Sequence, residues 1–308
     1  MFDNVTLKMY DLPQNYNLGD DVKILCKRDV NTYKCGIKNM IIYKNLNSLK
    51  IQGSLAKYLH DENITPLNRK EVKQAIKKLE QDIGFSLKNA VVCSVEFGTS
   101  IVVKEKPFEY MCLFGNTKRL TRVEYSKLTG IETILYTSNT GSFGFIGYDK
   151  TREMLDKKQD IPPLFAKSNV LRLESKMRTK RGIEAIFNGG LSAYDIFGKN
   201  VYKKFRMLFL EAYKNIEKRG RLVYVDKSKE ITPLKLLKLE AEQYRQSHPK
   251  EYCYLIQELN EAGKLTPKSL ERIRAENYHL GNDIYVSDQS PLIEELDALV
   301  YDSVMYGD

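Results

Sequence analysis

The sequence predicts an α+β protein in which an antiparallel sheet with flanking helices is followed by a helical C-terminal region. Short β-rich runs dominate the chain up to about residue 178, and from Gly182 onward apolar residues recur at helical spacing. Strands followed by helices, rather than alternating with them, are typical of this fold class. A chain of 308 residues is long enough for two domains, which we expect at residues 1–181 and 182–308.

Three runs near the N-terminus are typical of strands. Residues 22–25 and 40–43 are rich in aliphatic and β-branched side chains, and residues 48–54 alternate between apolar and polar positions. Asp and Asn residues, which favour turns, separate these runs. We therefore expect a series of short strands joined by hairpins.

A helix is expected to begin after Asn68. Asn68 is a suitable N-cap, and Glu71 lies three residues later, as in a capping box. Apolar residues then recur at helical spacing, and Gly84 lies just past the end of the pattern.

An apolar strand is expected at residues 90–97. Alternation places Val92, Ser94 and Glu96 on one of its faces, so that an acid lies near the end of an otherwise apolar strand. A short helix bearing Pro107 is expected to follow.

A hairpin and a further strand complete the predicted sheet. Residues 132–136 and 142–148 are expected to pair across a turn at residues 139–141. Residues 170–176 then alternate cleanly, with the charged residues on one face: Arg172, Glu174 and Lys176.

Helices are expected in the C-terminal region. Residues 200–218 carry apolar side chains at helical spacing. Pro233 is expected to start a second helix, and Thr266 and Pro267 to start a third.

The charge of the chain is uneven. The net charge is +9, yet residues 150–221 hold 18 basic and 8 acidic residues, whereas residues 230–308 hold 8 basic and 15 acidic. A local basic field attracts polyanions, so the middle stretch predicts a DNA-binding surface.

The five scattered cysteines do not form a pattern typical of disulfides or zinc sites. Without a signal peptide or membrane span in the sequence, we expect a cytoplasmic protein without membrane partners.

The segment around Tyr148 contains residue types that cleave a phosphodiester. A tyrosine hydroxyl can attack phosphorus and become a stable ester, and a nearby cation can stabilise the charge that develops. Tyr148 ends a predicted strand, strand geometry places Lys150 on the same face, and Glu153 follows after a turn. In a chain with 20 tyrosines, packed or surface tyrosines are the ordinary alternative.

Four other residues are candidates with ordinary alternatives. Glu96 can be a solvated acid at a strand edge, and Glu174 can belong to a cross-strand ion-pair ladder. His60 and Glu62 lie just before the capped helix, where a lone histidine is commonly a polar surface residue. The sequence has no phosphate-binding loop and no histidine pair with metal-ligand spacing.

The order of these segments resembles the replication endonucleases of filamentous phages, the gene II/gene X type, which initiate rolling-circle replication. The family pattern runs through a K-x-x-x-G-H-N segment in extended backbone, a helix, a strand ending R-I-D, a Y-x-K-x-x-E segment and a strand reading R-F-E. In this chain the matching positions are Lys57 to Asn63, the helix from Arg69, Ser94 to Glu96, Tyr148 to Glu153, and Arg172 to Glu174. Beyond about residue 182 the resemblance is poor.

The resemblance implies a fold of the rolling-circle endonuclease type and a metal-dependent nicking reaction. Tyr148 matches the nucleophile and Glu96 matches a metal-ligating acid, with glutamate in place of aspartate. The family histidine falls on Glu62, so that an oxygen-rich shell is expected, or the neighbouring His60 replaces it. The expected ligands of Mg²⁺ or Mn²⁺ are Glu62, Glu96, Glu153, Glu174 and His60.

The first functional hypothesis is therefore a DNA nicking and closing enzyme that forms a 5′-phosphotyrosine at a replication origin. Tyr148 and Lys150 would be catalytic, and a free 3′-hydroxyl would prime a host polymerase, with a host helicase as a further expected partner. Residues expected to contact DNA are Arg152, Arg172, Lys176, Arg178, Lys180 and Arg181. The alternatives are a DNA-binding regulator without catalytic activity and a scaffold protein unrelated to nucleic acids.

Overall fold

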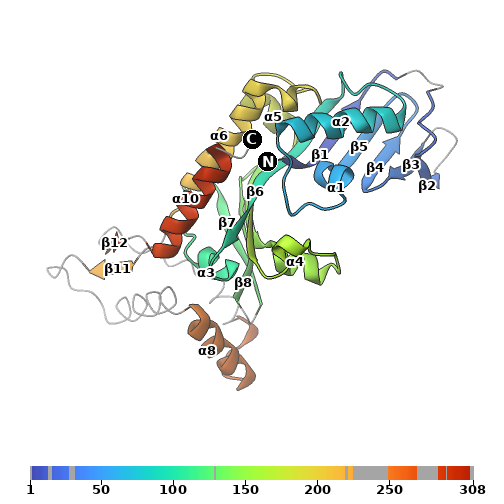
Figure 1. Cartoon of the computed structure of the whole chain (residues 1–308). Coiled ribbons are helices and arrows are strands. Elements are labelled where there is room, and N and C mark those ends of the chain that lie inside the picture. The colour runs from blue at the N-terminus through green and yellow to red at the C-terminus, as the bar shows by residue number, and fades with distance from the viewer. Residues whose placement is uncertain are drawn as a thin grey trace.

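The computed structural model covers the chain and confirms the predicted class, with antiparallel strands and flanking helices followed by helices near the C-terminus (Figure 1). The ranges that it describes are residues 2–12, 16–27, 32–127, 130–218, 221–224, 249–268, 284–288 and 290–305. The helix predicted from Pro233 lies outside these ranges, and the helix predicted from Pro267 is described only at its first two residues. Within the described ranges, no helix is both long enough and apolar enough to cross a bilayer.

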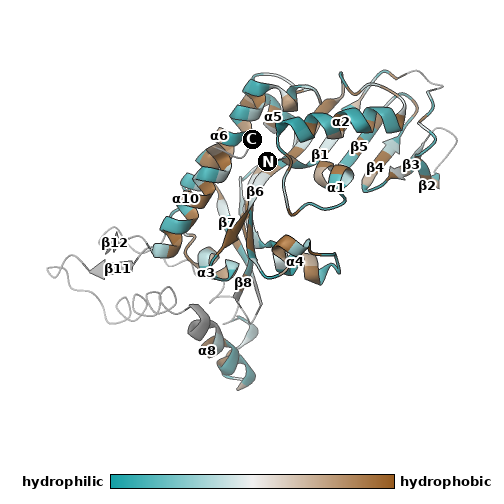
Figure 2. Ribbon diagram, viewed as in Figure 1, coloured by the Kyte–Doolittle hydropathy of each residue, from teal (hydrophilic) through white to brown (hydrophobic). Residues whose placement is uncertain are grey.

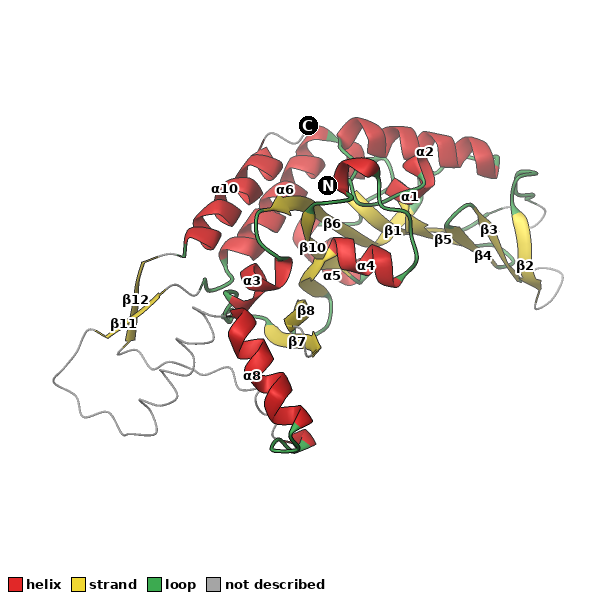
Figure 3. Cartoon of the chain, turned by 60° about the horizontal axis from the view of Figure 1, so that its bottom comes forward, coloured by secondary structure: helices red, strands yellow, loops and turns green. Residues whose placement is uncertain are grey.

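Ten strands form one antiparallel sheet, whose order is β2-β3-β4-β5-β1-β6-β10-β9-β8-β7. Figure 3 shows this sheet running from β2 at one end to β7 and β8 at the other. The strands are β1 Phe2–Met9, β2 Lys23–Lys27, β3 Tyr33–Ile37, β4 Met40–Lys44, β5 Leu49–Ser54, β6 Val91–Val103, β7 Thr121–Lys127, β8 Gly130–Thr137, β9 Phe143–Asp149 and β10 Asn169–Met177. A separate pair joins β11 Arg221–Tyr224 to β12 Ile284–Asp288, so that the C-terminal region is not wholly helical.

The helices lie between the strands and after them. They are α1 Leu55–His60, α2 Arg69–Ile83, α3 Pro107–Cys112, α4 Lys150–Asp156, α5 Lys180–Phe187, α6 Lys199–Lys214, α8 Pro249–Glu261 and α10 Pro291–Met305, with short 3₁₀ turns η1 Pro163–Phe165 and η2 Asp195–Phe197. Helix α6 ends four residues before the predicted Lys218, although Ile216 beyond it remains buried.

Helix α2 confirms the capping signals in the sequence. The Asn68 side chain accepts hydrogen bonds from the backbone N–H groups of Lys70 and Glu71, and the Glu71 carboxylate accepts from the Asn68 N–H. Gly84 ends the helix in the left-handed conformation at φ +83°, which glycine adopts without steric cost. The apolar side chains of α2 are buried in the core beneath β1, β4 and β5.

Two local predictions are wrong. The segment that matches K-x-x-x-G-H-N was expected to be extended, but residues 55–60 form α1 because the Ser54 hydroxyl caps its first turn by accepting from the Lys57 N–H. Val92 does not share a face with Ser94 and Glu96. The register between β1 and β6 shifts there, and the irregularity turns Val92 into the core.

One hydrophobic core spans both predicted domains. Phe205 of α6 packs edge-on against Phe2 of β1 at 5.0 Å and against Phe97 of β6 at 4.8 Å between ring centroids. Leu296 and Val300 of α10 belong to the same core. Figure 2 shows how helices such as α2 and α10 carry hydrophilic and hydrophobic residues on different sides. The C-terminal helices α6 and α10 therefore cover the sheet, while the division at residues 181 and 182 stays a prediction.

The opposite face of the sheet is polar. Along β10, Leu171, Leu173 and Met177 enter the core, whereas Arg172 and Glu174 point to the other face, as the alternation predicted. Helix α4 covers one end of this polar face through a small apolar cluster of Met154, Val170 and Ile64. The rest of the face, over β5, β1 and β6, carries partly exposed polar side chains such as those of Gln52, Thr6 and Ser94.

Gly98 allows β6 and β10 to approach closely at the polar face. A Cβ at this position would lie 2.0 Å from the Leu173 carbonyl oxygen and 2.7 Å from the Glu174 Cα. We expect Gly98→Ala to lower the free energy of unfolding by about 1 to 3 kcal/mol, because the strands must shift. Urea denaturation measures this effect. Gly190→Ala is the control, since an added Cβ there meets nothing within 4 Å. Equal stability of the two variants would contradict the prediction.

Candidate active site

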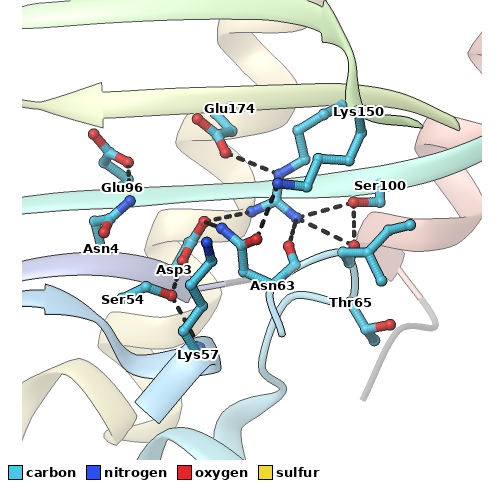
Figure 4. Close-up of polar contacts among 12 residues, drawn as sticks. Asp3, Asn4, Ser54, Lys57, Asn63, Thr65, Glu96, Ser100, Lys150 and Glu174 are labelled. Atoms are coloured by element: carbon cyan, nitrogen blue, oxygen red, sulfur yellow. Dashed lines mark hydrogen bonds and ion pairs between the residues drawn. The ribbon is translucent and has the colours of Figure 1, made fainter. Parts of the chain in front are cut away.

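The guanidinium of Arg172 is the centre of the candidate site. Its side chain is fully buried, and its nitrogens contact the carboxylates of Asp3 at 3.3 Å and Glu174 at 2.9 Å. It also donates to the Ser100 hydroxyl at 2.9 Å and to the carbonyl oxygens of residues 63 and 64. These partners come from β1, β6, β10 and the loop after α1 (Figure 4). One side chain thus fixes four segments of the chain.

Tyr148 joins this cluster through Glu174. The Tyr148 hydroxyl donates a hydrogen bond to Glu174 Oε1 at 3.1 Å, and the same oxygen accepts from Arg172 Nε. The two residues meet because β9 and β10 are neighbours, with Tyr148 paired to Arg172 in the register. A carboxylate within hydrogen-bonding distance of a hydroxyl can accept its proton. The geometry therefore places the Tyr148 hydroxyl beside a carboxylate that can accept its proton.

Lys176 connects the two acids of the polar face. Its ammonium lies 3.0 Å from Glu96 Oε1 and 3.4 Å from Glu174 Oε2. The second oxygen of Glu96 accepts a hydrogen bond from the Asn4 amide at 2.6 Å. The Lys176 side chain is 21% exposed, whereas that of Arg172 is fully enclosed. Lys176 is therefore the cation of the cluster that faces solvent.

Lys150 lies at the start of α4, and not in the strand as predicted. Asp149 caps this helix by accepting from the Arg152 N–H, and this ends β9 at residue 149. The buried Lys150 ammonium contacts Glu153 at 2.8 Å and the Asn63 side-chain oxygen at 3.0 Å. It also lies 6.0 Å from the centroid of the Tyr148 ring, within the range of a cation–π contact.

Burial and ion pairing together set the protonation states in the cluster. Burial raises the pKa of Tyr148, and the nearby Glu174 raises it further, so that the phenol is protonated at neutral pH. Burial also works to raise the pKa of Glu174, but Arg172 and Lys176 lower it overall, and this acid is ionised. Burial lowers the pKa of Lys150, although Glu153 opposes that shift.

The implied metal ligands do not fit a metal ion as they stand. Among the described residues, no three His, Cys, Asp or Glu side chains gather closely enough to hold one. Glu96 and Glu174 are bound to Lys176, and Glu153 contacts both Lys150 and Lys157. Each of these acids already has a cation supplied by the chain itself.

The remaining two candidates for the metal shell have other contacts. The Glu62 carboxylate accepts hydrogen bonds from the backbone N–H groups of Ile64 at 2.5 Å and Thr65 at 3.3 Å. These bonds close the turn at residues 62–65. His60 lies 3.3 Å from Glu71 of α2. Binding of Mg²⁺ or Mn²⁺ therefore stays a prediction.

The residues expected to bind DNA are divided between two environments. Arg172 and Lys176 lie within the cluster. Arg152 pairs with Glu132 at 2.9 Å, and Lys180 lies 3.5 Å from Glu184. Arg178 and Arg181 are exposed near the end of β10 and the start of α5. Arg178 is the nearer to the polar face, because its guanidinium lies over Gly144 of β9.

Sequence reasoning missed Asp3, Asn63 and Ser100. Asp3 is 1% exposed, binds Arg172, and accepts hydrogen bonds from the Ser54 hydroxyl and, at 3.0 Å, from the Asn63 amide. An acid within the apolar first strand was the available signal for Asp3. Asn63 occupies the asparagine position of the matched motif, and this was the signal for its role.

The comparisons with known proteins do not show a family. No family model and no curated protein matches this chain. A solved structure described as the rolling circle replication initiator protein from Geobacillus stearothermophilus is similar with a TM-score of 0.43 and 11% identity. The similarity covers 79% of this chain and 96% of that chain. Values this low establish neither a family nor an activity.

We expect Arg172→Met to lower the free energy of unfolding by about 3 to 5 kcal/mol at pH 7, because Asp3 loses its buried guanidinium partner and Glu174 keeps only Lys176. The loss should shrink as pH falls. Without Arg172, the burial that works to raise the pKa of Glu174 is opposed less, and a raised pKa in the folded state stabilises the protein progressively as pH decreases. In the wild type, Glu174 has a lowered pKa, so its contribution is lost as pH falls.

Urea titrations between pH 7 and pH 4 measure this difference in stability. Arg181→Met is the control, because Arg181 is exposed. A loss for Arg172→Met that stays constant with pH would contradict the assignment of buried, ionised partners.

We expect Lys176→Gln to bind Mn²⁺ at least about tenfold more tightly than the wild type, because it frees the facing oxygens of Glu96 and Glu174. Calorimetric titration of the protein with Mn²⁺ measures the affinity. Lys176→Arg keeps the positive charge and should remain as weak as the wild type. Equal affinity in all three proteins would mean that Lys176 does not compete with a divalent ion.

Proposed function

We propose that this chain is a DNA endonuclease that nicks one strand at a replication origin and remains bound to the 5′ end through Tyr148. One observation carries the proposal: segments matched separately in the sequence meet around Tyr148. Hydrogen bonds and ion pairs, some of them through Asp3 and Lys176, join the following residues in one cluster: Asn63, Glu96, Tyr148, Lys150, Glu153, Arg172 and Glu174. Such convergence supports a shared chemical role for these residues.

The proposed reaction is a displacement at phosphorus. The Tyr148 oxygen forms a bond to the phosphorus atom, and the bond from phosphorus to the 3′ oxygen breaks. Glu174 takes the phenolic proton, since it already accepts a hydrogen bond from this hydroxyl. The leaving 3′ oxygen takes a proton from solvent. The products are a 5′-phosphotyrosine and a free 3′-hydroxyl, and the reverse reaction closes the strand.

The cations of the cluster are suited to a phosphate. A phosphodiester that approaches Tyr148 brings negative charge to Lys176, the partly exposed partner of Glu174. Attraction to the phosphate weakens the ion pair between Lys176 and Glu174, and the Glu174 carboxylate becomes a stronger base. Lys150, near the Tyr148 ring, can stabilise charge on the attacking oxygen or the phosphate.

A role in rolling-circle replication fits this chemistry. The free 3′-hydroxyl primes a host polymerase, and the covalent bond conserves the energy needed to close the displaced strand. A host helicase would open the duplex ahead of the polymerase. The dependence on Mg²⁺ or Mn²⁺ is part of the proposal to be tested, because the acids of the cluster are paired with cations of the chain.

A DNA-binding regulator without catalytic activity is the second candidate. The raised pKa of Tyr148 and the pairing of each nearby acid with a cation are also properties of a stable, inactive ion-pair network. Such a protein would occupy an origin without cleaving it.

A denaturing gel separates these two functions. Purified protein is mixed with labelled single-stranded origin DNA in Mg²⁺, Mn²⁺ or EDTA. We expect a covalent protein–DNA adduct with the wild type and none with Tyr148→Phe, because the phenylalanine has no nucleophile. Tyr125→Phe is the matched control, since Tyr125 is exposed on β7.

Each alternative outcome has a defined meaning. DNA binding without an adduct under any metal condition would favour the regulator. An adduct that persists in Tyr148→Phe would show that another residue is the nucleophile. Formation of the adduct in EDTA would show that the reaction does not need the expected metal.

A further inference from the structure

The polar face of the sheet continues away from Tyr148 as two rows of aligned side chains. One row crosses four neighbouring strands through Ile41, Gln52, Thr6 and Ser94, each paired with the next in the register. Opposite partners in antiparallel strands lie on the same face. All four side chains are partly exposed, so that a ligand can reach the row.

The second row is basic and aromatic. It runs through Lys34, Tyr43, Lys50 and Lys8, again paired strand by strand. The ammonium groups of Lys50 and Lys34 lie 5.4 Å and 5.9 Å from the centroid of the Tyr43 ring. Lysines interleaved with an aromatic ring on an open face are suited to a polyanion that also carries rings.

A cavity of about 310 Å³ lies beside the first row. Its lining includes amides from three strand regions, namely Asn4, Asn39 and Gln52, and it extends to Glu96 and Lys176 of the candidate active site. The volume is at the lower end of the range found for small-ligand sites. The cavity is therefore continuous with the cluster around Tyr148.

The lining has hydrogen-bonding capacity that the described chain does not use. The Asn39 side-chain oxygen is buried without a hydrogen-bond partner among the described residues, while its amide nitrogen donates to the Ser54 carbonyl oxygen at 2.8 Å. Neither the Gln52 amide nor the Ser94 hydroxyl bonds to another described residue through its side chain. Buried polar groups are normally paired, so the Asn39 oxygen leaves one acceptor beside the cavity unsatisfied.

The groups that line the cavity are suited to hold a single nucleobase. Carboxamides present a donor and an acceptor side by side, and this is the pattern that base edges require. Ile41 supplies an apolar surface for the face of a base. Lys176 and Arg178 also line the cavity and are suited to the adjacent phosphate groups. A base can enter such a cavity only when it is unpaired.

We propose that this cavity binds one unpaired base of single-stranded DNA next to the phosphate that Tyr148 attacks, and that the row of lysines binds the adjoining backbone. This proposal rests on the proposed nicking function and adds a source of sequence preference to it. Gln52 reads the base edge, whereas Lys8 and Lys50 contribute charge without reading sequence.

Fluorescence anisotropy of the full chain with labelled 20-nucleotide oligomers of dA, dC, dG and dT tests the pocket. We expect the wild type to prefer one of the four, and Gln52→Ala to weaken that oligomer about tenfold or more while leaving the other three unchanged. Lys50→Ala should weaken all four alike and lower the slope of log affinity against log salt by about 0.7. Gln257→Ala on α8, away from the sheet face, should change nothing.

A second variant distinguishes a loss of base recognition from a loss of folding. Gln52→Glu leaves an acceptor in place of the amide and should shift the preference toward dC, whose exocyclic amine is a donor. Binding by the wild type without any preference, or a preference that both Gln52 variants retain, would overturn the pocket while the nicking function stands. Absence of DNA binding by the wild type at low salt would overturn the nicking function itself, and the pocket with it.

Discussion

The burial of one guanidinium organises the polar half of this molecule. A fully enclosed arginine is stable only when its charge and its N–H groups are matched, and here Asp3, Glu174 and Ser100 supply that match. These partners lie on three neighbouring strands, so the geometry of the sheet and the geometry of the site are fixed together. Tyr148 is placed by the same network through Glu174, which makes its position a property of the fold rather than of a loop.

Much of the fold could be predicted because local signals were strong. The capping box at Asn68 and Glu71 defined α2, and the clean alternation at residues 170–176 defined both faces of β10. The irregularity between β1 and β6 could not be predicted, because it depends on pairing with a strand about 90 residues away, as in the contact between Asn4 and Glu96. The helix α1 was missed because a single serine cap decides it, while the matched motif suggested extended backbone.

The sequence indicated which residues gather around Tyr148 better than it indicated their contacts. Tyr148, Lys150, Glu153, Glu96 and Glu174 were expected together, and the structure brings them into one cluster. Glu62 and His60 were expected there as well, but they have other contacts. An ion-pair ladder was one alternative for Glu174, but Lys176 and Arg172 were assigned to DNA, so that the first hypothesis did not pair them with the acids. The same cations are in fact positioned to neutralise the acids of the free protein. An anionic ligand would then compete for these cations instead of entering an empty positive site.

The distance along the chain between Asp3 and Arg172 has a consequence for how the protein is made. Their contact joins positions 169 residues apart, and β1 cannot complete its place between β5 and β6 until the segment up to residue 103 exists. Contacts of such long range form late, because they close large loops at an entropic cost. During synthesis, the ribosome must therefore release more than half of the chain before the charged cluster can assemble. A nascent or truncated chain that ends before Arg172 would have Tyr148 without its buried partners, and this ties any activity of the site to the strands on both sides of Arg172.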